Sequence, residues 1–286
     1  MNRAEFYTPG MEITPTSSAL GAEVSGIDLR SLTDADVDAI IDAWGDHGVL
    51  FFRDQDLSPE DHIAFAERIG SINVNRFFSA VDGHPQIAEV LKEADQAQNI
   101  GGGWHTDHSY DTEPAQGSVL YGREIPPVGG DTLFAGMGAA YDALSDGFKE
   151  MLNGLHAVHS SRHVFGDGAR GREGVTDRIG NPDAATQDSI HPVVIAHPHT
   201  GRSLLYVNPG FTTGIVGWNA RESAALLDFL YSHASRPEFQ TRFRWTQGAL
   251  AMWDNRSTWH FALNDYHGHR RYLHRITIEG CALQAA

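Results

Sequence analysis

The chain has 286 residues, 41% of them hydrophobic, and a formal net charge of -16 at pH 7. This length and composition allow a substantial core, and we expect one domain over residues 1–286. The acidic charge is spread along the chain, and no block of Lys or Arg could follow phosphates. Nucleic acid and anionic membranes are therefore poor partners, and a small-molecule substrate is favoured.

The compartment is indicated by cysteine usage and by the ends of the chain. The single cysteine, Cys281, cannot form an internal disulfide, which fits a reducing compartment. The N-terminus lacks a basic-then-apolar signal pattern, and no stretch reaches the roughly 18 apolar residues that a membrane span needs. We expect a cytoplasmic protein.

The first part of the chain predicts a short strand and turn at 19–30, and then two helices around a buried strand. Apolar residues recur at helical spacing over 33–44, and 48–52 is a short apolar run typical of a buried strand. The run Ser58-Pro59-Glu60-Asp61 supplies a cap, a proline at the first helical position and an acid at the third. The second helix therefore begins there, and Gly70 ends it.

Strands dominate the rest of the chain. Two short helices end near Leu155, and a helix capped by Asn219 and Glu222 runs through Ala234. The expected strands cover 117–122, 132–135, 191–197, 203–208, 243–245, 249–254 and 272–279. This order predicts a mainly β fold with flanking helices, either a sandwich or a barrel.

Residues 160–189 differ from their surroundings. They contain five glycines, many charges and few large apolar side chains. The stretch is too long for an ordinary connection inside a compact domain. Two interpretations stay open, which are a mobile surface insertion and a lid over an active site.

One metal site is easy to locate, because His105 and Asp107 form the only His-x-Asp or His-x-Glu pair among 16 histidines. In an extended strand, side chains two positions apart point the same way, so both can hold one ion. His260 is the candidate third ligand, although a histidine there is more often structural when considered alone. Two histidines and one carboxylate on one side of a metal are typical of non-haem Fe(II) oxygenases.

Arg271 and Arg275 share one face of the last expected strand. If that face is interior, each guanidinium needs an anion, because a buried unpaired charge costs several kcal/mol. Ligand carboxylates would serve, since planar guanidinium groups bind them with two hydrogen bonds. One arginine would hold a cosubstrate and the other a substrate. The alternative is an edge strand with two solvated arginines.

Five strings occur in order along almost the whole chain: LGAEVSGIDLR, WHTD, GGDTLF, WDNRSTWH and RRYLHRITIEG. Together they resemble the taurine / 2,4-dichlorophenoxyacetate dioxygenase family of Fe(II)- and 2-oxoglutarate-dependent oxygenases. The resemblance implies a double-stranded β-helix (jelly-roll) core. It also implies Fe(II), 2-oxoglutarate and O2 as cofactor and cosubstrates, and assembly as a homo-oligomer, either a dimer or a tetramer.

The resemblance also assigns residues by position. Its three iron ligands are His105, Asp107 and His260. Thr132 and Arg271 would bind the distal carboxylate of 2-oxoglutarate, and Arg275 would contact the anionic group of the substrate. Charge balance supports Arg271, because Fe(II) with one carboxylate carries a single positive charge and 2-oxoglutarate brings two negative charges.

Within this family, the strings GLHAVHSSRHVFG and HPVVIAHPHTGRSLLYVN are most similar to the branch that acts on aryloxyalkanoates, in particular (R)-2-aryloxypropionates. Where the taurine enzymes place an amide, a histidine and a tyrosine around a sulfonate, this chain has Gly101, Asn75 and Phe78. Fewer hydrogen-bond donors suggest a roomier, more apolar pocket. We expect hydroxylation of an aryloxyalkanoate-like carboxylate, with taurine or another alkylsulfonate or alkyl sulfate as the alternative.

Two other classes stay open on the residues alone: a Zn-dependent hydrolase and a non-catalytic metal-binding protein. Neither accounts for paired arginines on one strand. His108 directly follows Asp107 and is interpreted as cavity wall or surface rather than as a fourth ligand. The paired histidines beside turns are interpreted as loop residues: His197, His199, His267 and His269.

Overall fold

The computed structural model describes residues 9–166 and 181–286. The α-helices are α1 Asp34–His47, α2 Pro59–Ile69, α3 Met137–Asp142, α4 Asp146–Leu152, α5 Arg162–Phe165 and α6 Ala220–Ala234, with 3-10 helices at Pro182–Ala184 and Pro237–Phe239. The strands of the first half are β1 Glu12–Pro15, β2 Ala22–Ser25, β3 Val49–Phe52, β4 Ile72–Asn73, β5 Ala80–Val81, β6 His84–Lys92, β7 Gly117–Glu124 and β8 Thr132–Gly136. Those of the second half are β9 His156–Ser160, β10 Asp188–Pro192, β11 Val194–Ala196, β12 Ser203–Leu205, β13 Thr212–Ile215, β14 Gln240–Phe243, β15 Leu250–Asp254, β16 Thr258–Ala262, β17 Arg271–Ile278 and β18 Gln284–Ala285.

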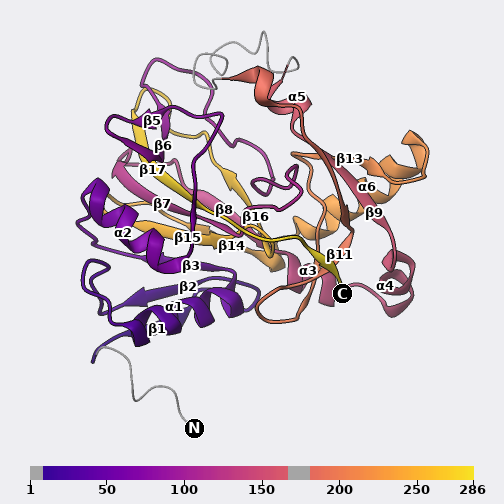
Figure 1. Ribbon diagram of the computed structural model, residues 1–286, viewed down its shortest axis with the longest axis horizontal. Helices are drawn as coiled ribbons and strands as arrows, with labels where there is room; N and C mark the ends of the chain where they lie inside the picture. Colours follow the sequence, from indigo (N-terminus) through magenta and orange to yellow (C-terminus); the bar gives the residue numbers. More distant parts are fainter. Residues whose placement is uncertain (1–8, 167–180) are drawn as a thin grey trace.

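The strands form one large sheet and three small ones (Figure 1). The nine-stranded sheet has the order β1-β2-β3-β15-β7-β17-β6-β5, and β4 pairs with β17. The three-stranded sheets have the orders β10-β9-β13, β12-β11-β18 and β14-β8-β16. The fold is therefore mixed and rich in strands, with helices at its flanks as the sequence predicts. Within the described residues, no helix has the length and apolar character to cross a membrane.

The two N-terminal helices begin where their capping residues predict. The Thr33 side chain accepts a hydrogen bond from the Asp36 amide, and the Ser58 side chain accepts one from the Asp61 amide. In each helix the acid bonds back to the amide of the cap residue, which completes a capping box. Helix α1 continues past the expected end at residue 44, because Gly48, with φ 72°, provides the C-cap.

The large sheet is packed on both faces. Helices α1 and α2 lie on one face (Figure 1). They bury Trp44 and Phe65 against sheet residues such as Met252. On the other face, apolar residues of β3 and β15 pack against the β14-β8-β16 sheet, where the rings of Phe51 and Phe243 stack with centroids 4.2 Å apart. These two sheets form the layers between which the candidate site lies.

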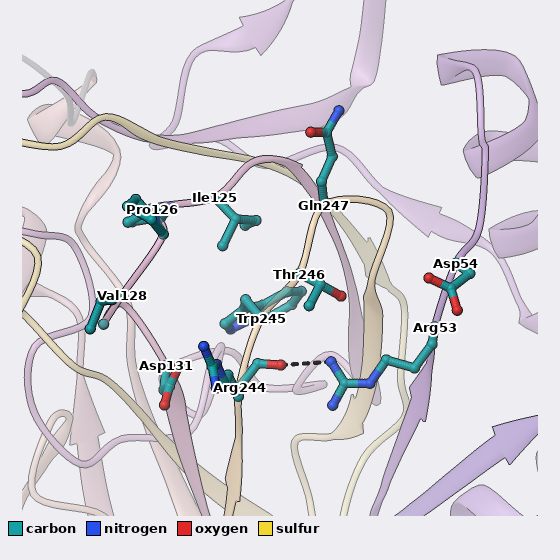
Figure 2. A pocket seen from close by; sticks show the side chains of 12 residues that line it. Arg53, Asp54, Ile125, Pro126, Val128, Asp131, Arg244, Trp245, Thr246 and Gln247 are labelled. Atoms are coloured by element: carbon teal, nitrogen blue, oxygen red, sulfur yellow. Dashed lines mark hydrogen bonds between the residues drawn. The ribbon is translucent and has the colours of Figure 1, made fainter.

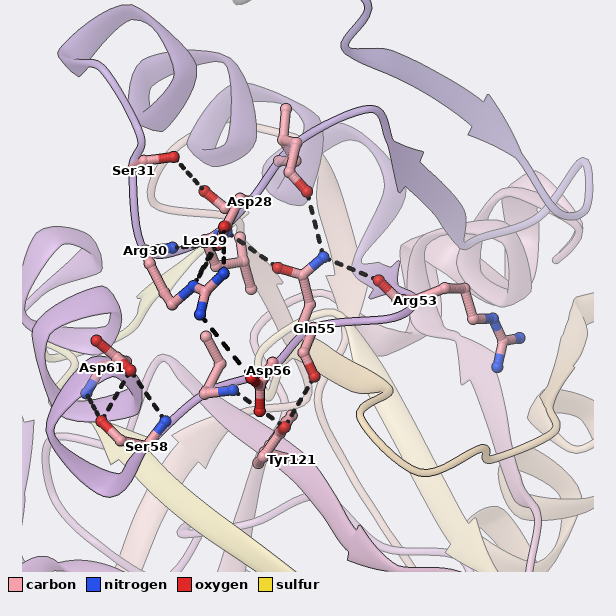
Figure 3. Close-up of polar contacts among 12 residues, drawn as sticks. Asp28, Leu29, Arg30, Ser31, Arg53, Gln55, Asp56, Ser58, Asp61 and Tyr121 are labelled. Carbon is pink, nitrogen blue, oxygen red and sulfur yellow. Dashed lines mark hydrogen bonds and ion pairs between the residues drawn. The ribbon is translucent and has the colours of Figure 1, made fainter.

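Polar contacts fix the turn between β3 and α2 (Figure 3). The Gln55 side chain donates to the Arg53 carbonyl at 2.8 Å and accepts from the Leu29 amide at 3.0 Å. The Tyr121 hydroxyl on β7 donates to the Gln55 carbonyl at 2.8 Å and accepts from the Leu57 amide at 3.1 Å. Side chains therefore satisfy polar backbone groups of this turn, in which Gln55 and Leu57 are buried.

Strand β17 corrects one alternative from the sequence. It pairs with β7 on one side and with β6 on the other, so it lies inside the sheet. The interpretation of Arg271 and Arg275 as solvated residues of an edge strand is wrong, because both side chains are buried. Strand β6, which pairs with this side of β17, carries no clear strand pattern in the sequence.

One further expectation changes, and another stays a prediction. The strand expected at 243–245 lies earlier, as β14, because the chain turns after it and Gly248 adopts a φ of 75° in that turn. Of the expected insertion at 160–189, residues 167–180 lie outside the described residues. Its described flanks contain α5 and the start of β10, and closure as a lid stays a prediction.

Candidate metal centre and active-site cavity

Three side chains from two distant parts of the chain meet between the two packed sheets. One ligand atom from each of His105, Asp107 and His260 lies within 4.8 Å of the other two. The distance from His105 Nε2 to Asp107 Oδ1 is 3.7 Å, and that from His260 Nε2 to Asp107 Oδ2 is 3.9 Å. Two imidazole nitrogens and one carboxylate at these separations fit one divalent metal ion and leave its other side open.

The backbone holds the two histidines together. The His105 amide donates to the His260 carbonyl at 3.2 Å, and the His260 amide donates to the His105 carbonyl at 2.8 Å. This single bridge replaces the extended strand expected at His105, because the chain turns from Asp107 onward. His105 Nδ1 lies 2.8 Å from the Gly103 carbonyl, so this nitrogen carries the hydrogen and Nε2 keeps its lone pair for a metal.

Glycine is required next to His105. A Cβ atom on Gly210 would lie 2.6 Å from the Cβ of His105, closer than real Cβ atoms approach. Any side chain at position 210 would therefore displace the ligand histidine. The sequence does not reveal this role, because nothing in the residues around Gly210 indicates that His105 packs against it.

Electrostatics favour a carboxylate and a neutral imidazole at the site. Burial alone would raise the pKa of Asp107, but the positive charge of Arg275, the strongest of the opposing influences, helps to hold it well below its usual range. Arg275 Nη1 donates to Asp107 Oδ2 at 3.2 Å, and Ser118 Oγ donates to the same oxygen at 3.3 Å. Burial, together with the nearby His105 ring, lowers the pKa of His260 well below its usual value. Both groups therefore have the protonation state that binds a metal cation.

The guanidinium of Arg271 is a buried cation that lines the same cavity as the metal-binding residues. The Arg271 side chain is buried, with the residue 4% exposed, and its Nε donates to the Gly130 carbonyl at 3.0 Å. Its Nη2 is buried without a hydrogen-bond partner among the described residues. Burial lowers the pKa of Arg271 to about 10, so the group is still charged at neutral pH. A buried guanidinium with an unused N–H edge is suited to a ligand carboxylate.

These groups line one cavity of about 640 Å³, a volume suited to small-molecule ligands. The structure brings all the residues proposed from the sequence to its wall, namely His105, Asp107, His260, Thr132, Arg271, Arg275, Asn75, Phe78 and Gly101. Two of them have local roles as well. Asn75 Oδ1 accepts from the amides of Phe77 and Phe78, and Thr132 Oγ1 accepts from Trp245 Nε1 at 2.9 Å.

One side of the cavity is aromatic, and sequence reasoning found only part of it. We call this side the aromatic wall, which consists of Phe78, Tyr110, Phe165 and Phe211. The rings of Tyr110 and Phe211 meet edge to face, with centroids 4.8 Å apart. The guanidinium of Arg275 lies 4.6 Å from the centroid of the Phe78 ring. The cavity therefore places a cation directly beside an apolar surface.

A second cavity of about 600 Å³ lies on the outer side of Trp245 (Figure 2). The 125–131 loop and the 244–247 turn line it, and Arg53 reaches across to donate to the Arg244 carbonyl at 2.6 Å. Trp245 also contacts Thr132 and Arg271, so one aromatic ring lies between the two cavities. Among the described residues that line this second cavity, none was proposed for the site.

Two other histidines, His108 and His197, lie outside the metal-binding group. His108 lines the first cavity without joining the metal-binding group, as expected for a wall residue. His197 lies in a turn as expected, yet it is buried and bonds through Nε2 to Asp254 Oδ2 at 2.9 Å. Arg256 forms a bidentate pair with the same carboxylate, so His197 belongs to a buried polar network beneath β15 and β16.

A strand-rich fold that carries two histidines, one carboxylate and a buried arginine around one cavity defines a class, the non-haem iron oxygenases. Residues 12–277 match the family described as "Taurine catabolism dioxygenase TauD, TfdA family", and the chain belongs to this family.

Relatives span nearly the whole chain. An alkylsulfatase from Acinetobacter baylyi is 35% identical, over 96% of this chain and 86% of its own length. A (S)-phenoxypropionate/alpha-ketoglutarate-dioxygenase from Delftia acidovorans is 33% identical, over 96% and 98%. The crystal structure of a putative alpha-ketoglutarate-dependent taurine dioxygenase from Burkholderia xenovorans superposes with a TM-score of 0.82 at 37% identity, covering 96% of this chain and 94% of that one.

The protein is therefore a 2-oxoglutarate-dependent dioxygenase that uses Fe(II), with the metal site at His105, Asp107 and His260. The predictions of family, reaction class and cofactors are confirmed. Family membership sets aside the Zn-dependent hydrolase and the non-catalytic metal-binding protein.

Proposed function

We propose that the protein hydroxylates a small carboxylate of the aryloxyalkanoate type at the carbon beside the ether oxygen. The observation that carries this proposal is the position of Arg275, whose guanidinium lies between Asp107 and the Phe78 ring. A substrate with its acid group on Arg275 would place an aryl ring against the aromatic wall. An alkylsulfonate or alkyl sulfate is the second candidate, favoured by the Acinetobacter relative and by the ability of the same guanidinium to bind either oxyanion.

The cosubstrate is proposed to bind between the metal and Arg271. Bound Fe(II) and 2-oxoglutarate together supply the O2-dependent oxidation of a C–H bond, with succinate and CO2 as products. Asp107 contributes one negative charge to the metal and Arg271 one positive charge to the distal carboxylate, so the site becomes neutral around a dianion. Thr132 Oγ1, which lines the same cavity, would donate a second hydrogen bond to that carboxylate.

Arg275 would orient the substrate. Its Nε is buried without a hydrogen-bond partner among the described residues, while Nη1 bonds to Asp107. The planar group therefore keeps N–H donors for a substrate acid, on the side of the cavity where Phe78 excludes water. Asn75 holds the backbone of Phe78 in place. The resemblance to the (R)-2-aryloxypropionate branch does not fix the preferred enantiomer, so the test below includes both.

The expected jelly-roll core and the expected homo-oligomer are proposals as well. We propose that the large sheet and the β14-β8-β16 sheet form the double-stranded β-helix core, which their packing around one cavity supports. We also propose a homo-oligomer, supported by large apolar side chains exposed at Val216, Trp218 and Phe229. Sedimentation velocity tests the oligomer, and a monomer at micromolar concentration would contradict it.

Product release tests the function. Hydroxylation of 2-phenoxypropionate beside the ether oxygen gives a hemiketal that separates into phenol and pyruvate, while one O2 and one 2-oxoglutarate give succinate and CO2. We expect phenol and succinate in equal amounts from anaerobically reconstituted enzyme after aeration. The panel includes both enantiomers, phenoxyacetate, taurine and a medium-chain alkyl sulfate. Succinate release that taurine or the sulfate ester stimulates, and that the phenoxy acids do not, would favour the second candidate.

A further inference from the structure

Trp245 lies between the first cavity and the second one (Figure 2). It follows β14, in the 244–247 turn, and is only 3% exposed. The Phe243 ring packs against it edge to face, with centroids 4.8 Å apart. On the side of the first cavity it contacts Thr132 from the β14-β8-β16 sheet and Arg271 from the large sheet. One side chain therefore touches both groups that are proposed to bind the distal carboxylate of 2-oxoglutarate.

The Thr132 side chain points from β8 toward the large sheet. Side chains two positions apart on a strand share a face, so Thr132 lies on the same face as Phe134. The centroid of the Phe134 ring lies 5.7 Å from that of Phe51 on the large sheet and 6.4 Å from that of His260. This face of β8 is therefore directed inward, between the sheets, and Thr132 lines the first cavity there.

The hydrogen bond between Trp245 and Thr132 has only one possible direction. An indole N–H donates and cannot accept, so Trp245 Nε1 donates to Thr132 Oγ1 at 2.9 Å. A threonine hydroxyl that accepts one bond can still donate another. Within the described part of the chain, no group accepts a hydrogen bond from this hydroxyl. Its hydrogen is therefore left for a ligand, and a carboxylate, which only accepts, is a matching partner.

The same indole supports the guanidinium of Arg271. Arg271 Cζ lies 5.6 Å from the centroid of the Trp245 ring and 6.0 Å from that of the Tyr266 ring. At this distance an aromatic face attracts a cation. The two rings and the bond from Nε to the Gly130 carbonyl restrict the guanidinium before any ligand arrives. A group that is already restricted binds its ligand more tightly, because less conformational entropy is lost on binding.

We propose that Trp245 is a positioning residue for the cosubstrate. Its N–H commits the Thr132 hydroxyl to donating toward the distal carboxylate of 2-oxoglutarate, and its ring holds Arg271 in place for the same carboxylate. This inference rests on the cosubstrate site of the proposed function and adds a residue that acts through two others. Because the distal carboxylate takes no part in the oxidation, loss of the N–H should raise KM for 2-oxoglutarate and leave kcat nearly unchanged.

Trp245→Phe tests the N–H, because it keeps an aromatic ring beside Arg271. Calorimetry on enzyme loaded with Mn(II) measures the affinity for N-oxalylglycine, an unreactive analogue of 2-oxoglutarate. We expect a loss of about 3- to 10-fold, which corresponds to one neutral hydrogen bond, and a similar rise in KM for 2-oxoglutarate.

Trp44→Phe is the matched control for this variant. The Trp44 side chain is equally buried, with the residue 3% exposed, and lines neither cavity. Its Nε1 has no hydrogen-bond partner among the described residues. The control should lower the melting temperature by a comparable amount and leave the affinity for N-oxalylglycine unchanged. An equal loss of affinity in Trp44→Phe would show a general effect of stability and refute the role of Trp245.

A double-mutant cycle shows whether the N–H acts through the hydroxyl. Thr132→Val removes the hydroxyl and nearly keeps the shape of the side chain. In that background, Trp245→Phe should change the affinity by less than about twofold, because the acceptor of the N–H is gone. In Thr132→Ser, which keeps a hydroxyl, most of the effect of Trp245→Phe should remain. Wild-type affinity in Trp245→Phe, or the same loss with and without the hydroxyl, would refute action through Thr132.

Trp245→Leu tests the support of Arg271, because it removes the ring as well as the N–H. It should weaken binding more than Trp245→Phe does. The additional loss should disappear in the Arg271→Ala background, since the guanidinium that the ring supports is then absent. An additional loss that persists without Arg271 would refute this part of the proposal.

The outcomes distinguish this inference from the proposed function. If Thr132→Val and Arg271→Ala both bind N-oxalylglycine as tightly as the wild type, the cosubstrate site itself is wrong. If both weaken binding and Trp245→Phe does not, the cosubstrate site stands and the role of Trp245 is refuted.

Discussion

Replacement of Arg271 by alanine offers the sharpest test of the proposed cosubstrate site. The variant removes a buried guanidinium whose Nη2 is unpartnered and whose Nε bonds to the Gly130 carbonyl. Hydrogen bonds to charged groups contribute about 1.5–3 kcal/mol each, and a bidentate pair contains two. Allowing for water that enters the space, a loss of about 3–4 kcal/mol is expected, or roughly 100- to 1,000-fold in the apparent affinity for 2-oxoglutarate.

The assay is succinate release as a function of 2-oxoglutarate concentration, with calorimetric binding as a second measurement. Fe(II) affinity should be unchanged, because Arg271 does not belong to the metal-binding group. Arg271→Lys keeps the charge but not the planar pair of donors. Its affinity for 2-oxoglutarate should lie between those of the wild type and Arg271→Ala.

Arg270→Ala is the matched control. This neighbouring arginine pairs with Glu93 and Glu124 in a more exposed position, where ion pairs contribute about 0–1 kcal/mol. It should leave the 2-oxoglutarate affinity close to that of the wild type. Equal affinities in Arg271→Ala and wild-type enzyme would refute the assignment, and so would an equal loss in Arg270→Ala.

Three further predictions concern metal, network and pH. His105→Ala should weaken Fe(II) binding by more than about 100-fold, because mutation even of residues that only hydrogen-bond to metal ligands lowers metal affinity by about 10- to 100-fold. Anaerobic titration with Fe(II) measures the affinity, and a wild-type value would contradict the metal site. Asp254→Ala leaves Arg256 buried without its bidentate partner, so the free energy of unfolding in urea should fall by about 3–5 kcal/mol, and an unchanged midpoint would contradict this. Burial lowers the pKa of His62 and of His159 to about 3, whereas the unfolded chain takes up these protons near pH 6.5. The contribution of these histidines to the free energy of unfolding is therefore complete above pH 6.5. It falls toward pH 3 by up to about 1.4 kcal/mol per pH unit for each histidine. His62→Leu should lose less stability over this pH range in urea melts, and a pH slope identical to that of the wild type would contradict the role of His62.

Local signals account for the elements that the sequence predicts well. Helix α6 begins after Asn219 as expected, because its capping box consists of Asn219 and Glu222, three residues apart. It also ends at Ala234 as expected. Strand β6 has no comparable signal. Its sequence, HPQIAEVLK, lacks clear alternation, and pairing with β17 and β5 makes it a strand. Helix ends can thus be read from neighbouring residues, whereas this strand depends on partners far along the chain.

The same distinction applies to the site. The metal ligands were predictable because His105 and Asp107 form a unique spaced pair and His260 ends a family motif. The aromatic wall was not, since Phe165 ends the short helix α5 and Phe211 lies in the turn before β13, without a shared period.

The reciprocal backbone bonds between His105 and His260 have a consequence for biogenesis. More than half of the polypeptide separates these residues, so the loop that their contact closes is among the most costly in entropy. A nascent chain that has not yet paired β16 with β8 cannot present both imidazoles to one cation. Iron uptake would therefore follow the docking of β16, and metal retention would report that this long-range contact has formed.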